Sequence, residues 1–131
     1  MAKNSPLLRV LVVEDEGLIR WSIAETLSGA GHTVIEADSG AAAIQELTNG
    51  HGPIDAIVLD YRLPDSNDLR LLASVRRLAP ASPVILMTAY GGPEVARGAL
   101  DLGAYTVMSK PFEMQDLEAL LVQACADQGA R

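Results

Sequence analysis

The segment 56–64 reads AIVLDYRLP, an apolar run that stops abruptly at a carboxylate. The run is long enough for one buried strand, and Asp60 and then Pro64 close it. An earlier run, 9–13, ends in the same way in Glu14-Asp15-Glu16. Ligands of open α/β sheets bind at the carboxyl ends of the strands. The acids that follow these two strands are therefore where function is to be sought.

The composition indicates one soluble globular domain. The chain has 131 residues, 49% hydrophobic and 21% charged, which suits a single core. No apolar segment approaches the roughly 20 residues needed to cross a bilayer, and the N-terminus shows no secretory signal. We therefore expect a cytoplasmic protein with no membrane attachment. The net charge of -7 argues against direct nucleic acid binding by this domain.

Strand-like and helix-like patterns alternate along the chain. The expected strands are 8–13, 32–37, 56–60, 84–88 and 105–109. The expected helices run from Gly17 to the glycines at 29–31, from a Ser39 cap to Leu47, from Leu69 to Leu78, from Pro93 to Leu102, and from just after Phe112 to the tail. This alternation predicts an α/β fold, a flavodoxin-like (βα)5 three-layer sandwich with parallel sheet order 2-1-3-4-5. We expect a flexible lead at 1–7, the domain at 8–126 and a tail at 127–131.

In that strand order the two strands that end in acids are neighbours. Glu14, Asp15 and Asp60 then converge, and carboxylates at roughly 4 Å repel by about 1 to 4 kcal/mol per pair near a surface. A cation must relieve this repulsion. All-oxygen ligation is what Mg²⁺ prefers, and the chain has no Cys and His cluster for a softer metal. His32, at a strand start, and His51, in a glycine-rich turn, suit structural or solvated roles.

Two further polar side chains stand at strand ends on the same edge. Thr88 offers a hydroxyl, and Lys110 offers a point charge suited to a phosphoryl oxygen. Taken singly, these residues have plainer explanations, because acids cap helices, threonine suits strands and lysine is usually solvated. Their occurrence together at successive strand ends is harder to treat as chance. A carboxylate nucleophile, a metal, a hydroxyl and a lysine fit phosphoryl transfer.

Four short blocks carry a family resemblance that spans nearly the whole chain. They are Val12–Glu16 (VVEDE), Leu59–Pro64 (LDYRLP), Met87–Tyr90 (MTAY) and Ser109–Phe112 (SKPF). In this order and at these separations they resemble the signature blocks of the receiver domain of bacterial two-component response regulators. The resemblance implies that Asp60 accepts a phosphoryl group from the phosphohistidine of a sensor histidine kinase or a phosphotransfer protein. It also implies Mg²⁺, or Mn²⁺ in its place, held by Asp15, Asp60 and the backbone carbonyl of Arg62.

The same resemblance assigns roles to the residues around Asp60. Glu14 matches the first acidic position and would contact the metal through water. Thr88 would hydrogen-bond a phosphoryl oxygen, and Lys110 would pair with the phosphoryl charge. The backbone amide of Ala89 would be free to approach the phosphoryl group. The peptide before Pro111 would be cis, and Arg62 and Tyr90 would modulate dephosphorylation.

The sequence departs from the receiver pattern in two places. Receivers usually have an aromatic residue three positions before the lysine, coupled to the motion of the threonine, and this chain has Val107. Tyr105 is a candidate substitute on the same strand face, although a plain core or surface tyrosine is the simpler interpretation. The glycine usual in the loop after the phosphoacceptor strand is replaced by Asp68, preceded by Asn67, which tolerates a left-handed conformation.

The resemblance implies a signalling switch that is not a conventional turnover enzyme. Phosphorylation would rearrange the surface formed by the helix at 93–102, the strand at 105–109 and the last helix. That surface would control an output domain in a longer chain or a partner, with transcription regulation as the expected output, and it allows a homodimer. The segments Ile19–Trp21 and Met87–Gly91 are similar to receivers of the nitrogen-regulator class.

Three other functions remain as alternatives. An interaction module that works without phosphorylation is compatible with Val107, although the intact acids, threonine and lysine weigh against it. An aspartyl-phosphate phosphohydrolase with a D-x-D arrangement would need an acid where the chain has Arg62. A nucleotide-binding fold is weaker still, because acids follow the first strand where a glycine-rich loop would stand.

Overall fold

A parallel sheet forms the centre of the molecule. The computed structural model describes residues 7–50, 52–66, 68–89 and 92–129. Within these residues, five strands form one sheet in the order β2-β1-β3-β4-β5. The strands are β1 (Arg9–Val13), β2 (Thr33–Ala37), β3 (Ala56–Asp60), β4 (Val84–Thr88) and β5 (Thr106–Ser109). The predicted flavodoxin-like fold and its strand order are therefore confirmed.

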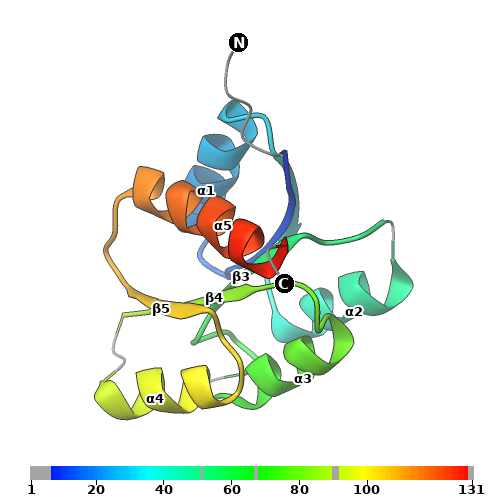
Figure 1. Cartoon of the computed structure of the whole chain (residues 1–131). Helices are drawn as coiled ribbons and strands as arrows, with labels where there is room; N and C mark the ends of the chain where they lie inside the picture. The colour runs from blue at the N-terminus through cyan, green and yellow to red at the C-terminus, as the bar shows by residue number, and fades with distance from the viewer. Residues whose placement is uncertain (1–6, 51, 67, 90–91, 130–131) are drawn as a thin grey trace.

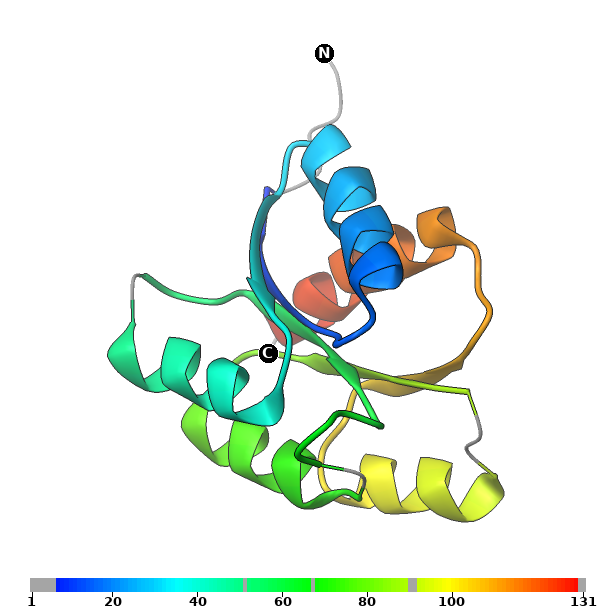
Figure 2. The ribbon, with the colours of Figure 1, turned by 180° about the vertical axis from the view of Figure 1, so that it is seen from behind.

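Helices cover both faces of this sheet. They are α1 (Gly17–Gly29), α2 (Gly40–Asn49), α3 (Arg70–Leu78), α4 (Pro93–Asp101) and α5 (Met114–Gly129). Helices α1 and α5 lie on one face, and α2, α3 and α4 lie on the other (Figures 1 and 2). Each helical layer packs its own core against the sheet. The three-layer sandwich follows from this arrangement.

The strands at the centre of the sheet are apolar up to their last residues because both of their faces are covered. Every residue of β3 and β4 is buried. The burial extends to the last residue of each strand, so Asp60 and Thr88 are buried although they are polar. The sheet thus carries two polar groups to its carboxyl edge without exposing them.

Side chains that the sequence marks as helix starts act as caps. The Ser39 hydroxyl accepts the backbone N–H of Ala42 at 3.1 Å, which confirms the predicted cap of α2. A carboxylate oxygen of Glu16 accepts the N–H of Ile19 at 3.1 Å and caps α1 in the same way. Pro93 occupies the first turn of α4, where its missing N–H leaves no bond unmade.

The last helix is longer than the sequence indicated. We expected a tail from Asp127, but α5 continues to Gly129. The Asp127 carboxylate accepts a hydrogen bond from the Tyr105 hydroxyl at 2.6 Å and another from the side-chain amide of Gln123 at 3.1 Å. These bonds hold the final turns of α5 beside the start of β5, which begins at Thr106 and not at Tyr105 as expected.

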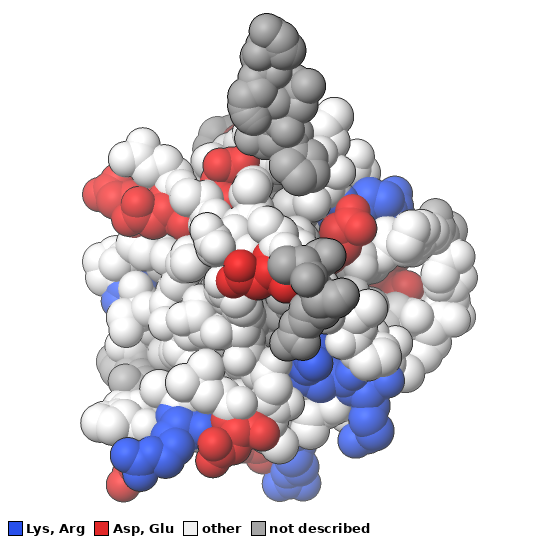
Figure 3. Space-filling model, viewed as in Figure 1, with Lys and Arg blue, Asp and Glu red and all other residues white. Residues whose placement is uncertain are grey.

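The charges are unevenly distributed over the surface. On the face shown in Figure 3, most basic side chains lie over α3 and α4, and most acidic side chains lie above them. Two of the basic residues, Arg76 and Arg77, are in the last turn of α3, where positive charge interacts favourably with the helix dipole. No helix in the described ranges combines the length and the apolar character that crossing a membrane requires.

His32 links three elements on the side of the sheet that α1 and α5 cover. Its buried ring nitrogen Nδ1 accepts the backbone N–H of Leu8 at 3.0 Å. Because Nδ1 accepts this hydrogen bond, it carries no proton, so the ring proton lies on Nε2, which donates to the Glu118 carboxylate of α5 at 2.9 Å. The structural role expected for His32 is therefore confirmed.

We predict that His32→Ala lowers the free energy of unfolding by about 1 to 3 kcal/mol, because the buried N–H of Leu8 loses its acceptor. Denaturant unfolding followed by circular dichroism measures this change. Glu118→Gln is the matched control, since a glutamine oxygen can still accept the Nε2 proton, and it should stay within about 0.5 kcal/mol of wild type. Equal losses in the two variants would mean that charge, and not the bond to Leu8, holds this junction.

Candidate functional site

Polar residues from β1, β3, β4 and β5 meet at the carboxyl edge of the sheet. Asp60 is the last residue of β3 and lies opposite Met87, the neighbour of Thr88, in β4. The backbone N–H of Lys110 donates to the carbonyl of Thr88 at 2.8 Å, which sets the lysine next to the end of β4. The parallel register therefore brings together residues that are far apart in the sequence.

The acids form a compact cluster. One carboxylate oxygen from each of Glu14, Asp15 and Asp60 lies within 4.8 Å of the others. Glu14 is 1% exposed and Asp60 is 6% exposed, whereas Asp15 is open to solvent. The convergence predicted for these three residues is thus present in the structure, with one side left accessible.

Lys110 is the counter-charge of the two buried acids. Its Nζ lies 2.8 Å from Oε1 of Glu14 and 3.2 Å from Oδ2 of Asp60. Burial alone lowers the pKa of Lys110, but the hydrogen bond to Glu14 and the charges of both acids outweigh it, so the pKa lies above its ordinary value. The lysine is therefore held in its charged form between the carboxylates.

One lysine does not fully compensate two buried carboxylates. Burial, the charge of Glu14 and a hydrogen bond with Glu14 together raise the pKa of Asp60 to about 6, against the opposing effect of Lys110. Placing negative charge on Asp60 is thus unfavourable in the protein alone. A hard divalent cation with oxygen ligands, such as Mg²⁺, would relieve this cost, so the donor set fits the predicted metal.

Backbone contacts fix the orientation of Glu14. Its N–H donates to the carbonyl of Ala37 in β2 at 3.0 Å, and its carbonyl accepts a hydrogen bond from the Arg20 guanidinium at 2.8 Å. Oε2 accepts the N–H of Glu16 at 3.0 Å, which leaves Oε1 to Lys110. The direct pair between Glu14 and Lys110 was not anticipated, because the sequence analysis assigned the lysine to the phosphoryl group alone.

A profile of the response regulator receiver domain matches residues 10–122, which is most of the chain. The chain belongs to the response regulator receiver domain family. Both the family and the expected function class are therefore confirmed.

The curated relatives of this receiver include transcriptional regulators. It is 34% identical over 115 residues to the DNA-binding transcriptional regulator NtrC of Escherichia coli K12, a match that covers 88% of this chain and 24% of the relative. It is 36% identical over 114 residues to the transcriptional regulatory protein TcrA of Mycobacterium tuberculosis H37Rv, covering 87% of this chain and 44% of the relative. The chain thus spans about a quarter to a half of the length of these relatives.

Solved structures share the fold over nearly the whole chain. A receiver domain protein (CheY-like) from Methanospirillum hungatei superimposes with a TM-score of 0.88 at 26% identity, covering 95% of this chain and 98% of that one. The beryllofluoride-activated NtrC4 receiver domain dimer gives a TM-score of 0.83 at 29% identity, covering 92% and 98%. NtrX of Brucella abortus, solved in complex with ADP, gives 0.84 at 28% identity, covering 95% of this chain and 28% of that one.

The remaining site residues of the receiver occupy varied surroundings. The peptide between Lys110 and Pro111 is cis, as the resemblance implied. Ala89 is exposed and lines, with Ile19, Lys110, Pro111, Phe112 and Met114, a hollow of about 350 Å³ beside the acidic cluster. Arg62 is exposed in the loop after β3, and its N–H reaches Oδ1 of Asp60 at 3.4 Å. Tyr90 and Asn67 lie outside the described residues.

Val107, at the position that is usually aromatic in receivers, packs against the hydrophobic core. It is half-buried and lies on the side of the sheet covered by α2, α3 and α4. Tyr105 directs its hydroxyl to Asp127 of α5. This contact favours the plain surface role for Tyr105 over substitution for the missing aromatic.

We predict that Asp60→Asn stabilises the receiver at neutral pH without added metal, by roughly 1 to 3 kcal/mol. The ionised Asp60 costs stability because its pKa is higher in the folded state than in the unfolded state, so the cost is complete above about pH 6 and disappears as the pH falls towards 3.8. Unfolding free energies measured from pH 4 to 8 test this.

Two further measurements sharpen the test. Mg²⁺ added at pH 7.5 should stabilise wild type more than Asp60→Asn, and so narrow the gap between them. Asp101→Asn removes an exposed carboxylate of α4 and should show neither effect. A stability gap that is the same at pH 4 and pH 7.5 would contradict the burial of an uncompensated charge at Asp60.

Proposed function

We propose that Asp60 accepts a phosphoryl group from the phosphohistidine of a sensor histidine kinase or a phosphotransfer protein, and that this step switches the receiver between two states. The observation that carries the proposal is the position of the Asp60 carboxylate, buried at the end of β3 between Glu14 and Lys110. A carboxylate in that place is both nucleophilic and next to a cation that can take up phosphoryl charge.

The reaction is a displacement at phosphorus. An oxygen of the Asp60 carboxylate forms a bond to phosphorus while the bond from phosphorus to the histidine nitrogen breaks, and the imidazole leaves with the electron pair of that bond. The product is an acyl phosphate on Asp60 and a dephosphorylated histidine. The chain's own part in this step is chiefly positioning and charge neutralisation.

The acidic cluster would hold the metal that this chemistry requires. Asp15, Asp60 and the backbone carbonyl of Arg62 are the proposed direct ligands of Mg²⁺, or of Mn²⁺ in its place, and Glu14 would contact it through water. The ion supplies positive charge to the phosphoryl oxygens as the transfer proceeds.

The other strand-end residues would respond to the new group. Lys110 already lies 3.2 Å from Oδ2 of Asp60, so it would pair with a phosphoryl oxygen after only a small movement. Thr88, buried at the end of the neighbouring strand, would hydrogen-bond a second oxygen. The backbone amide of the exposed Ala89 would approach the phosphoryl group from the side of the hollow that Ala89 and Lys110 line. Tyr90 and Arg62 would modulate the loss of the phosphoryl group.

The response would reach partners through the α4-β5-α5 surface. Thr88 ends β4, which pairs with β5, so a movement of its side chain bears directly on that surface. The curated relatives are transcriptional regulators of which the match covers 24% and 44%, and the NtrC4 receiver domain was solved as a dimer. We therefore propose an output domain in transcription regulation, and a homodimer through α4-β5-α5. The receiver acts as a signalling domain and turns over only its own phosphoryl group.

We predict that incubation with acetyl phosphate and Mg²⁺ adds one phosphoryl group to the protein, as measured by intact mass. The adduct should be stable in acid and labile in base, as an acyl phosphate is, and it should disappear when Mg²⁺ is omitted. Asp60→Asn should give no adduct, because the amide is a poor nucleophile. Asp101→Asn, which removes an exposed carboxylate of α4, is the control and should give the same adduct as wild type.

Two outcomes would contradict the proposal. An adduct of the same occupancy in Asp60→Asn would place the phosphoryl group elsewhere. Absence of an adduct from acetyl phosphate and from competent phosphohistidine donors, with no measurable Mg²⁺ binding, would favour an interaction module that works without phosphorylation.

We predict that Lys110→Ala still accepts a phosphoryl group but no longer transmits it, because the ammonium that links Asp60 to β5 is lost. Backbone amide shifts of α4, β5 and α5 in ¹H–¹⁵N NMR spectra, recorded before and after phosphorylation, measure the response. Lys110→Arg keeps the charge and should retain part of it. A full response in Lys110→Ala would remove the lysine from the switch.

A further inference from the structure

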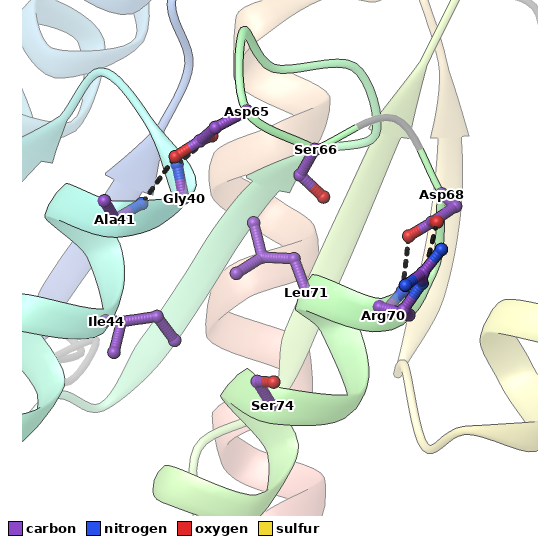
Figure 4. Close-up of a pocket in the computed structure, with 9 residues that line it drawn as sticks. All are labelled: Gly40, Ala41, Ile44, Asp65, Ser66, Asp68, Arg70, Leu71 and Ser74. Atoms are coloured by element: carbon purple, nitrogen blue, oxygen red, sulfur yellow. Dashed lines mark hydrogen bonds and ion pairs between the residues drawn. The ribbon is translucent and has the colours of Figure 1, made fainter.

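The loop that follows Asp60 is attached to the start of α2 by one side chain. Leu63 and Ser66 exchange two backbone hydrogen bonds, of 2.7 and 3.2 Å, so the chain between them forms a tight turn. Asp65 lies in this turn, and its carboxylate points at the first residues of α2 (Figure 4). Oδ1 accepts the N–H of Gly40 at 2.8 Å, and Oδ2 accepts the N–H of Ala41 at 2.9 Å.

Asp65 completes the capping of α2 from a distant part of the chain. The first N–H groups of a helix have no partner within it. Ser39 satisfies the N–H of Ala42, and Asp65 satisfies the two before it. These bonds hold the pKa of the Asp65 carboxyl below its ordinary value, so the carboxylate is charged when it faces the positive end of the helix dipole.

The close approach depends on the absence of a side chain at Gly40. A Cβ at this position would lie 3.1 Å from Oδ1 of Asp65 and 3.1 Å from the side chain of Leu71 in α3. Below this contact, α2 and α3 border a hollow of about 480 Å³, which the hydrogen bonds of Asp65 cross at one end (Figure 4). The hydrogen bonds of Asp65 therefore join the loop to α2 across the open end of this hollow, while Leu63 of the same turn is buried in the core.

This link joins the two halves of the acidic cluster. The first half, Glu14 and Asp15, follows β1, and the N–H of Glu14 is bonded to Ala37 at the end of β2. The chain runs from Ala37 through Ser39 directly into α2. The second half is Asp60 and the loop after β3. Asp65 thus connects the loop after Asp60 to α2, and the start of α2 is connected through Ala37 to Glu14.

The proposed backbone ligand of the metal lies between two fixed points of this loop. On one side, the N–H of Tyr61 donates to the carbonyl of Met87 at 2.8 Å. On the other side, the N–H of Leu63 donates to Ser66 in the turn that Asp65 anchors, at 2.7 Å. The carbonyl of Arg62 is therefore placed by the β4 strand and by the turn together, and release of the turn frees one of its two supports.

We propose that Asp65 is a positioning residue that sets the Mg²⁺ affinity of the receiver by holding the loop of Arg62 against α2. The inference rests on the proposed metal site, and it adds a residue that touches neither the metal nor the phosphoryl group. Partners that orient a metal ligand from outside the site commonly change affinity tenfold or more when they are removed.

The decisive experiment is an Mg²⁺ titration followed by ¹H–¹⁵N NMR on wild type and four variants, with a thermal melt of each. Asp65→Ala removes both hydrogen bonds, and Asp65→Asn keeps one acceptor oxygen. We expect Mg²⁺ to bind about three to ten times more weakly to Asp65→Ala, with Asp65→Asn between it and wild type. A stepwise loss of Mg²⁺ affinity from wild type through Asp65→Asn to Asp65→Ala would indicate positioning. If Asp65→Ala does not fold, Asp65→Asn still tests the inference.

Two variants separate positioning from its simpler causes. Ser39→Ala removes a hydrogen bond from the same end of α2 but leaves the loop attached, so it should lower the melting temperature and leave the Mg²⁺ affinity within about twofold of wild type. Asp68→Asn removes the same charge from the same loop, where Asp68 bonds only to its neighbour Arg70 among the contacts shown in Figure 4, and it should also bind Mg²⁺ as wild type does.

Each other pattern would overturn the inference. Equal weakening in Ser39→Ala would assign the effect to the stability of α2, and equal weakening in Asp68→Asn would assign it to net charge. Wild-type affinity in both Asp65 variants would show that the loop holds its position without the link. If wild type itself does not bind Mg²⁺, the proposed metal site fails, and the inference fails with it.

Discussion

The burial of two carboxylates beside one ammonium is the interaction on which the site depends. Glu14 and Asp60 share Lys110 at 2.8 and 3.2 Å, in a place where water cannot screen them well. The balance of charge remains negative, and burial together with the charge of Glu14 raises the pKa of Asp60. The proposed divalent cation would offset this imbalance, and with it in place the site could accept the proposed phosphoryl group.

The sheet lowers the entropic cost of bringing these charged groups together, because backbone hydrogen bonds fix the position of each residue. Glu14, Asp60 and Lys110 all sit at or next to strand ends whose hydrogen bonds are made to neighbouring strands. The side chains therefore lose little freedom in meeting, and the apolar rows behind them in β3 and β4 exclude water. Helices on both faces are needed for this, since a strand exposed on one face could not bury its last residue.

Much of the architecture could be predicted from local patterns. The alternation of apolar runs and amphipathic segments was enough for the fold and strand order, and Ser39 was recognisable as a cap from its position alone. The convergence of Glu14, Asp15 and Asp60 followed from the strand order. Each of these inferences needs only the chain's near neighbours or a rule about parallel sheets.

Contacts between distant segments could not be predicted in this way. Nothing near Asp65 in the sequence indicates that its partners lie 25 residues earlier, and nothing near His32 points to Glu118. The pair between Lys110 and Glu14 was missed for a related reason, because the family resemblance describes the lysine in its phosphorylated setting. The end of α5 was misplaced because its last turns are held by Tyr105, far away in the sequence.

Stability and the proposed signalling involve the same charges in this receiver. A cation that binds the folded state and offsets the charge of Asp60 stabilises that state, so the proposed metal would relieve the cost that burial imposes there. The proposed phosphoryl group would add negative charge, which the metal and Lys110 would have to balance. In the proposed switch, a change at Asp60 would act on β4 and β5 through Thr88 and Lys110, which are joined by a backbone hydrogen bond. Because Val107 brings no aromatic ring to this path, the backbone pairing of β4 with β5 and the ammonium of Lys110 would carry more of the proposed response than in a receiver with the usual aromatic residue.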